Sequence, residues 1–440
     1  MDGGGMSNYP PEVFMDRMRN ELGEEWPAFR QAYDLPAVRG IRFRPEIPDL
    51  LQNDRAKMER IPWESNGFYT DTEAEWGKTI LHEAGAFYLQ EPSAMIPAAV
   101  FNAQPGETLL DLCAAPGGKS TQVGAAMTGK GVLVCNEIVP KRAQILSRNI
   151  ERMGIRNAIV TQEFPERLAG KWPEGFDGVL VDAPCSGEGM FRRDPETIGE
   201  WSTEKARGCA ERQREILEQA AKLVRPGGRL VYSTCTFHPD ENEGNVRWFL
   251  DRFPEFEPEP FDFCGETIRE GYRTFYPHRI RGEGQFAARF RKWGTGTAEL
   301  GSASLPPVGK EERKMLRELF SDTLPEENIR AWGTRLIQMD ALPDLSGIRV
   351  LRCGLHIAEK REKYLLPDHA LALSGATHTE AEDLDAELAA KYIAGETVPS
   401  NQNGWVAARY RGMNLGWGKA GQGTMKNHYP KGLRKLHLLP

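Results

Sequence analysis

Apolar strand patterns alternate with amphipathic helical patterns along residues 106–253, and this alternation limits the chain to few folds. The strand patterns cover residues 108–113, 131–137, 158–163, 176–184 and 229–235, and the helical patterns cover residues 120–128, 140–154, 203–224 and 240–253. Buried strands that alternate with helices form parallel sheets covered on both faces. The sequence therefore predicts an α/β fold with a doubly wound sheet, which we assign to residues 86–293.

The segments that flank this core have other patterns. Residues 1–85 open with apolar residues at three- and four-residue steps, which predicts a helical N-terminal region, and residues 61–95 are aromatic-rich and loop-like. Residues 294–307 are rich in Gly, Ser, Thr and Pro and are interpreted as a linker. Beyond the linker we expect a small α+β domain at 308–375 and a C-terminal domain at 376–440, in which an acidic helix ends near residue 394.

Composition excludes several classes of protein. Among the 440 residues, no run approaches the ~18 apolar residues of a membrane helix, and the start lacks the basic and apolar segments of a signal peptide. The seven cysteines are an odd number, and none has the spacing of a zinc site. We therefore expect a cytoplasmic protein with reduced thiols, without a metal or a membrane, and we take it to be a monomer.

The charge of the chain is unevenly distributed. The net charge is −7, yet residues 398–440 contain seven basic residues and no Asp or Glu. Trp405, Tyr410, Trp417 and Tyr429 are interleaved with these basic residues. Basic groups neutralise phosphates and aromatic rings stack on unpaired bases, so this end is a candidate RNA-binding surface. The alternatives are a solvated tail, or aromatic side chains that form the core of a small domain.

The motif DLCAAPGGK, residues 111–119, lies where the first core strand ends and a helix begins. Ligands of doubly wound sheets bind outside the carboxyl ends of the strands, glycines let a ligand approach the backbone, and a helix N-terminus favours a carboxylate. The motif differs from a triphosphate-binding loop. It fits a cofactor with a methionine carboxylate, and Glu137 follows at the distance at which an acid binds ribose. The alternatives are a plain tight turn and a solvated acid.

Two cysteines lie at the ends of two later strands. Cys185 is part of DAPCSGEGM and Cys235 is part of STCTF, ahead of residues 239–243, which we interpret as the cap of the next helix. A single free cysteine is most often simply buried. Two thiols and the Asp182 carboxylate at one sheet edge, beside a cofactor loop, favour catalysis.

This combination suits the methylation of cytosine. Carbon 5 of cytosine is a poor nucleophile, but a thiolate that adds to carbon 6 makes an enamine whose carbon 5 can attack a sulfonium methyl group. A carboxyl group that hydrogen-bonds nitrogen 3 of the ring assists this addition. A base must then remove the carbon-5 proton before the thiolate leaves, and the attacking thiol must be able to ionise.

The motifs DLCAAPGGKSTQ, NEIVPKRAQILSRNIERMG, DAPCSGEGMFRRDPE and STCTFHPDENE, in this order and spacing, resemble those of the Nol/Nop/Sun-type RNA cytosine-C5 methyltransferases. The resemblance covers at least residues 86–293, and the flanking stretches resemble the bacterial branch of the family that modifies 16S ribosomal RNA. It implies a Rossmann-like class I methyltransferase core, S-adenosyl-L-methionine as cofactor, an RNA-binding N-terminal region and a PUA-like RNA-binding region at the C-terminus.

The resemblance also implies roles for individual residues. Cys235 matches the family's nucleophile, Cys185 the thiol that assists product release, and Asp182 the acid that contacts the cofactor and the base. Glu137 matches the ribose-binding acid, and Glu163 is a candidate for the adenine edge because the family often has an Asp at that strand end. The cofactor loop comprises Cys113, Ala114, Ala115, Pro116, Gly117, Gly118 and Lys119, and Lys119 is also a catalytic candidate.

Three other functions share part of this pattern. A transfer-RNA cytosine methyltransferase would have the same core and differs in which RNA it labels. A non-catalytic RNA-binding ribosome assembly factor would keep the fold, although both thiols, Asp182 and the loop argue against it. A DNA cytosine methyltransferase normally has its nucleophile in the Pro-Cys motif and a large target-recognition insertion, which is not evident here. We therefore predict methylation of ribosomal RNA, specifically 16S ribosomal RNA of the small subunit.

Overall fold

A nine-stranded sheet forms the centre of the computed structural model, which describes residues 10–440 except 72, 304, 321–327 and 376–379. Its order is β12-β13-β8-β7-β4-β5-β6-β16, with β9 beside β13. The five strands from β8 to β6 run parallel, and the outer strands pair antiparallel, so the predicted doubly wound core is confirmed. The strands are β4 (Thr108–Asp111), β5 (Val132–Asn136), β6 (Ala158–Thr161), β7 (Phe176–Asp182), β8 (Val224–Thr234), β9 (Phe256–Pro258), β12 (Tyr272–Phe275), β13 (Gln285–Lys292) and β16 (Val350–Cys353).

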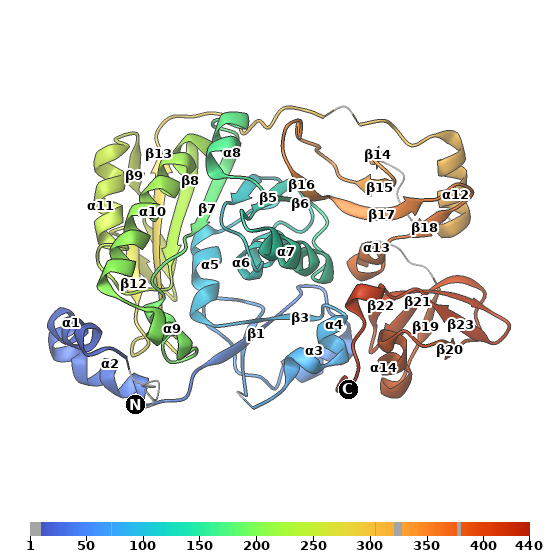
Figure 1. Ribbon diagram of the computed structural model, residues 1–440, viewed down its shortest axis with the longest axis horizontal. Helices are drawn as coiled ribbons and strands as arrows, with labels where there is room; N and C mark the ends of the chain where they lie inside the picture. The colour runs from blue at the N-terminus through green and yellow to red at the C-terminus, as the bar shows by residue number, and fades with distance from the viewer. Residues whose placement is uncertain (1–9, 72, 304, 321–327, 376–379) are drawn as a thin grey trace, which may run out of the picture.

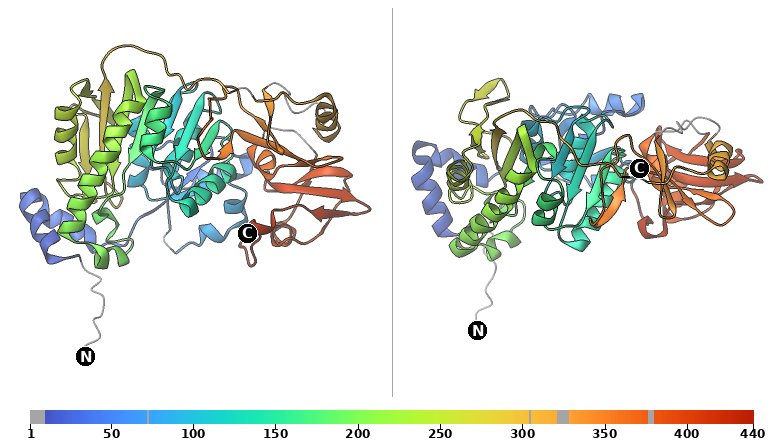
Figure 2. Two further views of the ribbon diagram at one scale, coloured as in Figure 1. Left: turned by 45° about the horizontal axis from the view of Figure 1, so that its top comes forward. Right: turned by 90° about the horizontal axis from the view of Figure 1, so that it is seen from above.

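Helices cover both faces of this sheet (Figures 1 and 2). On one face, Leu217 and Phe249 of two helices pack among buried strand residues. On the other face, Phe101, Val123 and Leu146 of three helices do the same. Both faces therefore bury apolar side chains, which is the main stabilising term of such a sheet. The helices of the first face are α8 (Pro165–Lys171), α10 (Thr203–Leu223) and α11 (Glu243–Arg252), and those of the second are α5 (Ile96–Phe101), α6 (Gly118–Ala126) and α7 (Pro140–Arg152).

Strand β8 begins five residues earlier than the predicted start at residue 229. Val224 already pairs with Phe176 of β7, and the register then shifts before Arg229 pairs with Gly178. The sequence Pro226-Gly227-Gly228 lies inside this shift, and Gly227 has a φ of +75°, which favours glycine. These residues form an irregularity within the strand, whereas the pattern placed them between a helix that ends at residue 224 and a strand that begins at residue 229.

The N-terminal region contains more strand than predicted. After α1 (Glu12–Leu22) and α2 (Trp26–Tyr33), β1 (Arg39–Phe43) lies between β2 (Gly67–Thr70) and β3 (Phe87–Gln90) in a three-stranded antiparallel sheet. The short helices α3 (Asp49–Arg55) and α4 (Ile80–Glu83) lie between these strands in the chain. The structure thus places β2, β3 and α4 in the stretch that was predicted to be loop-like. It also places β3 in the N-terminal sheet, beyond the predicted boundary at residue 85.

Residues 308–375 do not form an isolated unit. Four of their described strands form a separate sheet, but the fifth, β16, pairs antiparallel with β6 of the core. The core sheet therefore continues across the predicted linker into the C-terminal half of the chain. The remaining elements of this part are α12 (Lys310–Phe320), β14 (Ile329–Trp332), β15 (Arg335–Gln338), β17 (Leu355–Lys360), β18 (Leu365–Pro367) and α13 (His369–Ser374).

Over the residues that the structure describes, the C-terminal domain is a five-stranded sheet with one α-helix and a 3-10 turn at Lys431–Leu433, at the opposite end of the molecule from α1 and α2 (Figure 1). The helix ends at residue 394, as predicted, but starts only at residue 386, because Asp385 caps its N-terminus and the acids before it lie in a strand. Its elements are β19 (Ala381–Asp383), α14 (Ala386–Ala394), β20 (Val398–Pro399), β21 (Gly404–Tyr410), β22 (Met413–Gly421) and β23 (Thr424–Asn427).

Most aromatic residues of the basic C-terminal segment serve its core. Tyr410, Trp417 and Tyr429 are buried, and only Trp405 is half-buried. Lys435 forms an ion pair with Glu83 of the N-terminal region. The stacking role predicted for these rings is therefore restricted to Trp405, and the alternative of a small-domain core applies to the other three.

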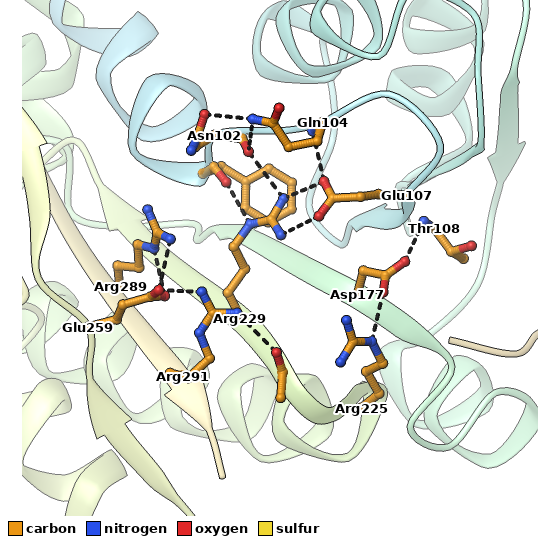
Figure 3. A network of polar contacts seen from close by, with 12 residues as sticks. Asn102, Gln104, Glu107, Thr108, Asp177, Arg225, Arg229, Glu259, Arg289 and Arg291 are labelled. Atoms are coloured by element: carbon orange, nitrogen blue, oxygen red, sulfur yellow. Dashed lines mark hydrogen bonds and ion pairs between the residues drawn. The ribbon is translucent and has the colours of Figure 1, made fainter. Parts of the chain in front are cut away.

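A network of ion pairs lies at the amino ends of the core strands, away from the predicted site (Figure 3). The guanidinium of Arg229 on β8 binds both carboxylate oxygens of Glu107 at 2.7 Å. Asp177 of β7 accepts hydrogen bonds from the backbone N–H of Thr108 at 2.8 Å and from Arg225 at 2.7 Å. These contacts tie β4, β7 and β8 together at the edge opposite to the one where ligands bind.

Candidate active site

The predicted cofactor loop joins β4 to α6 at the carboxyl edge of the sheet. Gly117 caps α6 with a φ of +112°, a backbone conformation that residues other than glycine rarely adopt. Arg42 of β1 is fully buried behind the loop and donates hydrogen bonds to the Gly118 carbonyl at 3.0 Å and to the Thr121 hydroxyl at 2.7 Å. A residue of the N-terminal sheet therefore fixes the first turn of α6.

A cavity of about 490 Å³ opens at this loop. Its volume lies within the range of about 300–1,000 Å³ that is usual for small-molecule sites. One wall comes from the loop and Asp182, and the facing wall comes from residues 88–91 of the N-terminal sheet. The cavity residues predicted from the sequence are Cys113, Ala114, Ala115, Pro116, Gly118, Lys119 and Asp182.

Asp111, at the end of β4, is a buried acid in the wall of this cavity. Its Oδ2 accepts a hydrogen bond from the Ser120 hydroxyl at 2.6 Å, while its Oδ1 has no hydrogen-bond partner among the described residues. Burial raises the pKa of Asp111 to about 7. An unpartnered carboxylate oxygen on a cavity wall is suited to a cationic ligand group.

Asp182, at the end of β7, is held on both oxygens. Its Oδ2 accepts a hydrogen bond from the Lys119 ammonium at 2.7 Å, and its Oδ1 accepts one from the Ser233 hydroxyl at 2.7 Å. Gln285 of β13 also donates to Oδ1, at 3.4 Å. Burial lowers the pKa of Lys119, but the charge of Asp182, the hydrogen bond to it and the charges of nearby acids together outweigh burial and raise that pKa above its usual value. Lys119 thus stays protonated beside Asp182.

The two predicted thiols are in direct contact. The Sγ atoms of Cys185 and Cys235 lie 3.2 Å apart, and both residues are partly exposed. One residue further along, the hydroxyls of Ser186 and Thr236 are hydrogen-bonded at 2.8 Å. The hydrogen bond to Cys235 and burial together raise the pKa of Cys185. Either sulfur can donate the hydrogen bond that joins the two thiols.

The side chain of Glu241 contacts the residue that follows Cys185. Its carboxylate is buried and accepts hydrogen bonds from the backbone N–H of Ser186 at 3.0 Å and from Gln213 at 2.8 Å. Burial raises the pKa of Glu241 to about 7. The pattern predicted that residues 239–243 cap α11, but the N-cap residue Asn242 makes no side-chain capping bond. Glu241 instead fixes the residue that follows Cys185.

Glu137 and Glu163, at the ends of β5 and β6, lie outside the wall of this cavity. Glu137 accepts a hydrogen bond from the backbone N–H of Val139 at 2.8 Å, and its other oxygen lies 3.4 Å from Arg142. Arg142 in turn donates to the Ala115 carbonyl at 2.8 Å, which links Glu137 to the cofactor loop.

Glu163 is buried and accepts a hydrogen bond from the backbone N–H of Arg349 at 2.8 Å, while its other oxygen lies 3.5 Å from Arg167. Both of its oxygens thus have protein partners. The adenine contact that was assigned to Glu163 stays a prediction.

Several site residues were not predicted. Ser233 directly precedes the Thr-Cys motif, and Gln285 lies in the YPHRIRGEGQFAARF stretch, so both were within recognisable segments. Tyr88 and Gln90 had only the aromatic-rich character of their stretch as a signal. Nothing local in the sequence indicates that β3 faces the cofactor loop.

The structure holds no group of three or more His, Cys, Asp or Glu side chains arranged for a metal ion among the residues it describes. In the same residues, no helix combines the length and the apolar character needed to cross a membrane. All seven cysteines are free thiols.

A doubly wound sheet with a glycine-containing cofactor loop at its carboxyl edge, next to an acid and two thiols, defines a Rossmann-like methyltransferase. The chain belongs to the 16S rRNA methyltransferase RsmB/F family, whose model matches residues 98–291. Three further models match the flanks: the N-terminal domain of 16S rRNA methyltransferase RsmF at 11–92, the first C-terminal domain of the RsmF rRNA methyltransferase at 314–374, and the methyltransferase RsmF PUA domain at 380–435.

Relatives with known names match nearly the whole chain. The ribosomal RNA small subunit methyltransferase F of Enterobacter sp. (strain 638) is 33% identical, over 96% of this chain and 95% of its own length. The protein of the same name from Vibrio vulnificus (strain YJ016) is 32% identical, over 97% and 98%. Among solved structures, a methyltransferase homologue from Pyrococcus horikoshii is 29% identical, with a TM-score of 0.56 over 65% of this chain and 96% of that one.

Proposed function

We propose that this methyltransferase transfers a methyl group from S-adenosylmethionine to carbon 5 of a cytosine in 16S ribosomal RNA, with Cys235 as nucleophile. The observation that carries the proposal is the contact of two thiols, 3.2 Å apart, at the carboxyl ends of adjacent parallel strands. The names of the relatives, which are ribosomal RNA small subunit methyltransferases, support ribosomal RNA as the substrate.

The residues around the cavity fit the cofactor. The N-terminus of α6 suits a carboxylate, and the unpartnered Oδ1 of Asp111 on the cavity wall suits an ammonium group. S-adenosylmethionine carries both groups on its methionine end and supplies an electrophilic methyl group. We assign its carboxylate to residues 116–119 and its ribose to Glu137, which Arg142 connects to the loop.

Cys235 is the thiol suited to attack. In this assignment Cys185 donates the hydrogen bond toward Cys235, and a donated hydrogen bond stabilises a thiolate at Cys235. Addition of this thiolate to carbon 6 of the base makes carbon 5 nucleophilic. The Lys119 ammonium donates a hydrogen bond to Asp182 at 2.7 Å, and we assign to this pair the proton that assists the addition at nitrogen 3 of the ring.

Cys185 is suited to the second half of the reaction. After methyl transfer, the proton on carbon 5 must leave before the Cys235 thiolate can be released. Cys185 lies beside the carbon–sulfur bond that has to break, because its Sγ is 3.2 Å from that of Cys235. It assists removal of the proton, directly or through a water. The target base reaches both thiols only when it leaves its stack.

The test is methyl transfer from a tritiated donor to 16S ribosomal RNA, to small ribosomal subunits and to transfer RNA, followed by bisulfite sequencing of the labelled RNA. We expect label at cytosine in 16S ribosomal RNA or the small subunit, and none with Cys235→Ala. Cys264→Ala is the matched control, because Cys264 is an exposed free thiol outside the site. Label in transfer RNA alone would favour the transfer-RNA alternative, and a protein that binds RNA without labelling any would favour an assembly factor.

The free thiols favour a reducing compartment for this protein. Seven free cysteines, two of them in contact, stay reduced in the cytoplasm, where we place the protein. We expect it to act as a monomer on RNA.

A further inference from the structure

Two more cavities continue from the cofactor cavity along the N-terminal sheet. A cavity of about 520 Å³ shares Arg193 and residues 89–91 with the cofactor cavity. A third, of about 680 Å³, shares residues 36–39 and Thr70 with the second. Cavities that share wall residues adjoin, so the second and third form one groove that leads away from Asp182. We call these two cavities the N-terminal groove.

Two arginine side chains of this groove have no partner among the residues that the structure describes. Arg39 lines both of its cavities, and Arg193 lies where the groove meets the cofactor cavity. Both side chains are exposed, and neither has a hydrogen bond or ion pair with any residue that the structure describes. An exposed arginine without a protein partner presents five donors to an incoming anion.

Two arginines at the far end of the groove are paired with exposed acids. Arg279 pairs with Glu25 and Arg281 pairs with Glu59, and all four side chains are between 46% and 66% exposed. Exposed pairs joined by a single contact contribute about 0–1 kcal/mol, so an anion of higher charge density can replace Glu59 at Arg281 at little cost, whereas Glu25 holds Arg279 through two hydrogen bonds. Arg281 also lies 4.1 Å over the ring of Tyr69, which holds its guanidinium at the groove.

Six basic and three acidic side chains line the groove, so basic charge is in excess. Glu75 forms an exposed ion pair with Lys78, which lines the same cavity. Glu91 is buried and accepts hydrogen bonds from the backbone N–H groups of Ser93 at 2.9 Å and Glu283 at 2.8 Å. Asp71 accepts a bond from the backbone of residue 73 at 2.9 Å. The groove therefore favours an anion over a cation.

We propose that the N-terminal groove holds the phosphates of single-stranded RNA next to the target cytosine, a role that rests on the proposed function. The groove adjoins the cofactor cavity, whose wall includes Asp182, so it offers a path for an RNA strand whose cytosine lies at Asp182. Unpaired loops are also the RNA elements whose bases can reach an active site.

The test uses Arg39→Ala and Arg281→Ala, which remove two guanidiniums of the groove without touching the cofactor cavity. Arg252→Ala is the matched control, because Arg252 on α11 is 61% exposed, is paired with a glutamate and lines none of the three cavities. Thermal unfolding of each variant checks the fold. Binding of a 16S ribosomal RNA transcript is measured by filter binding across a salt series, and methylation is measured at saturating cofactor.

Each groove variant should bind RNA several-fold more weakly and have a raised Michaelis constant for RNA, with unchanged kcat and cofactor affinity. For a single strand, the slope of log affinity against log salt should decrease in magnitude by about 0.7 for each phosphate that the protein no longer neutralises. Binding and slope equal to those of Arg252→Ala would overturn the proposal. So would weaker binding to the small ribosomal subunit with unchanged binding to the transcript, since the groove would then hold a ribosomal protein. If the unmodified enzyme labels no RNA, the proposed function fails instead.

Discussion

Glu241 is expected to make the protein less stable as the pH rises, because folding buries its carboxyl group. Burial raises its pKa from an ordinary value of 4.5 to about 7, even though Ser186 and Gln213 donate hydrogen bonds to it. Each pKa unit corresponds to about 1.36 kcal/mol, so ionising Glu241 in the folded state costs about 3 kcal/mol more than in the unfolded state. Replacing it by Gln keeps an oxygen acceptor and removes the ionisation.

The sign follows from the direction of the shift. A carboxyl whose folded pKa is raised favours folding fully below its unfolded pKa, and this contribution is lost as the pH rises toward 7. At about pH 5.5 the penalty is about 1.4 kcal/mol, and at about pH 8.5 it reaches its full value of about 3 kcal/mol. The free energy of unfolding of Glu241→Gln, relative to the unmodified protein, should therefore increase by about 2 kcal/mol between these two pH values.

Urea denaturation of both proteins at the two pH values measures this difference. Every other titrating group is present in both proteins, including Asp111, whose pKa burial also raises to about 7, so these contributions cancel. Glu211→Gln on the exposed face of α10 is the control and should show no pH-dependent difference. A difference between Glu241→Gln and the unmodified protein that stays constant with pH would refute the burial argument.

Three further outcomes are expected. Glu137→Ala should weaken cofactor binding by about 1–3 kcal/mol, since a charge-assisted hydrogen bond to the ribose is removed, and calorimetry that shows an unchanged affinity would contradict this. Arg229→Met should leave Glu107 without its cationic partner and lower the free energy of unfolding by about 3 kcal/mol in urea denaturation, with kcat retained. Thr236→Val should slow product release, because the hydrogen bond to Ser186 is removed. Thr236→Ser keeps a hydroxyl and should restore the rate of product release. Equal rates of product release for the two variants in single-turnover assays would disprove this role.

The sequence predicted those parts of the site that depend on local order along the chain. Asp182, Cys185 and Cys235 each lie within three residues of the end of a parallel strand, and such ends meet at one sheet edge. Their contact therefore follows from recognising the strands. The glycine loop was recognisable for the same reason, since its chemistry and its place between β4 and α6 are encoded in nine consecutive residues.

Contacts between distant segments could not be predicted in this way. The pairing of β16 with β6 joins residues nearly two hundred positions apart, and four-residue strands carry too little pattern to choose a partner. The placement of Arg42 behind the cofactor loop also depends on how the N-terminal sheet docks on the core. From its position just before a helix, Glu241 was interpreted as a capping residue. Its burial against Ser186 could not be predicted, because it depends on the packing of three separate elements.

The central claim is that Cys235 attacks the base and that Cys185 helps to release the product. The most direct measurement is a denaturing gel of Cys185→Ala after incubation with 16S ribosomal RNA and S-adenosylmethionine. The account predicts a slowly migrating protein–RNA adduct, because the methylated base stays attached through Cys235. The adduct should be absent with the Cys185→Ala/Cys235→Ala double variant. An adduct that forms with Cys235→Ala and not with Cys185→Ala would contradict the account and reverse the roles of the two thiols.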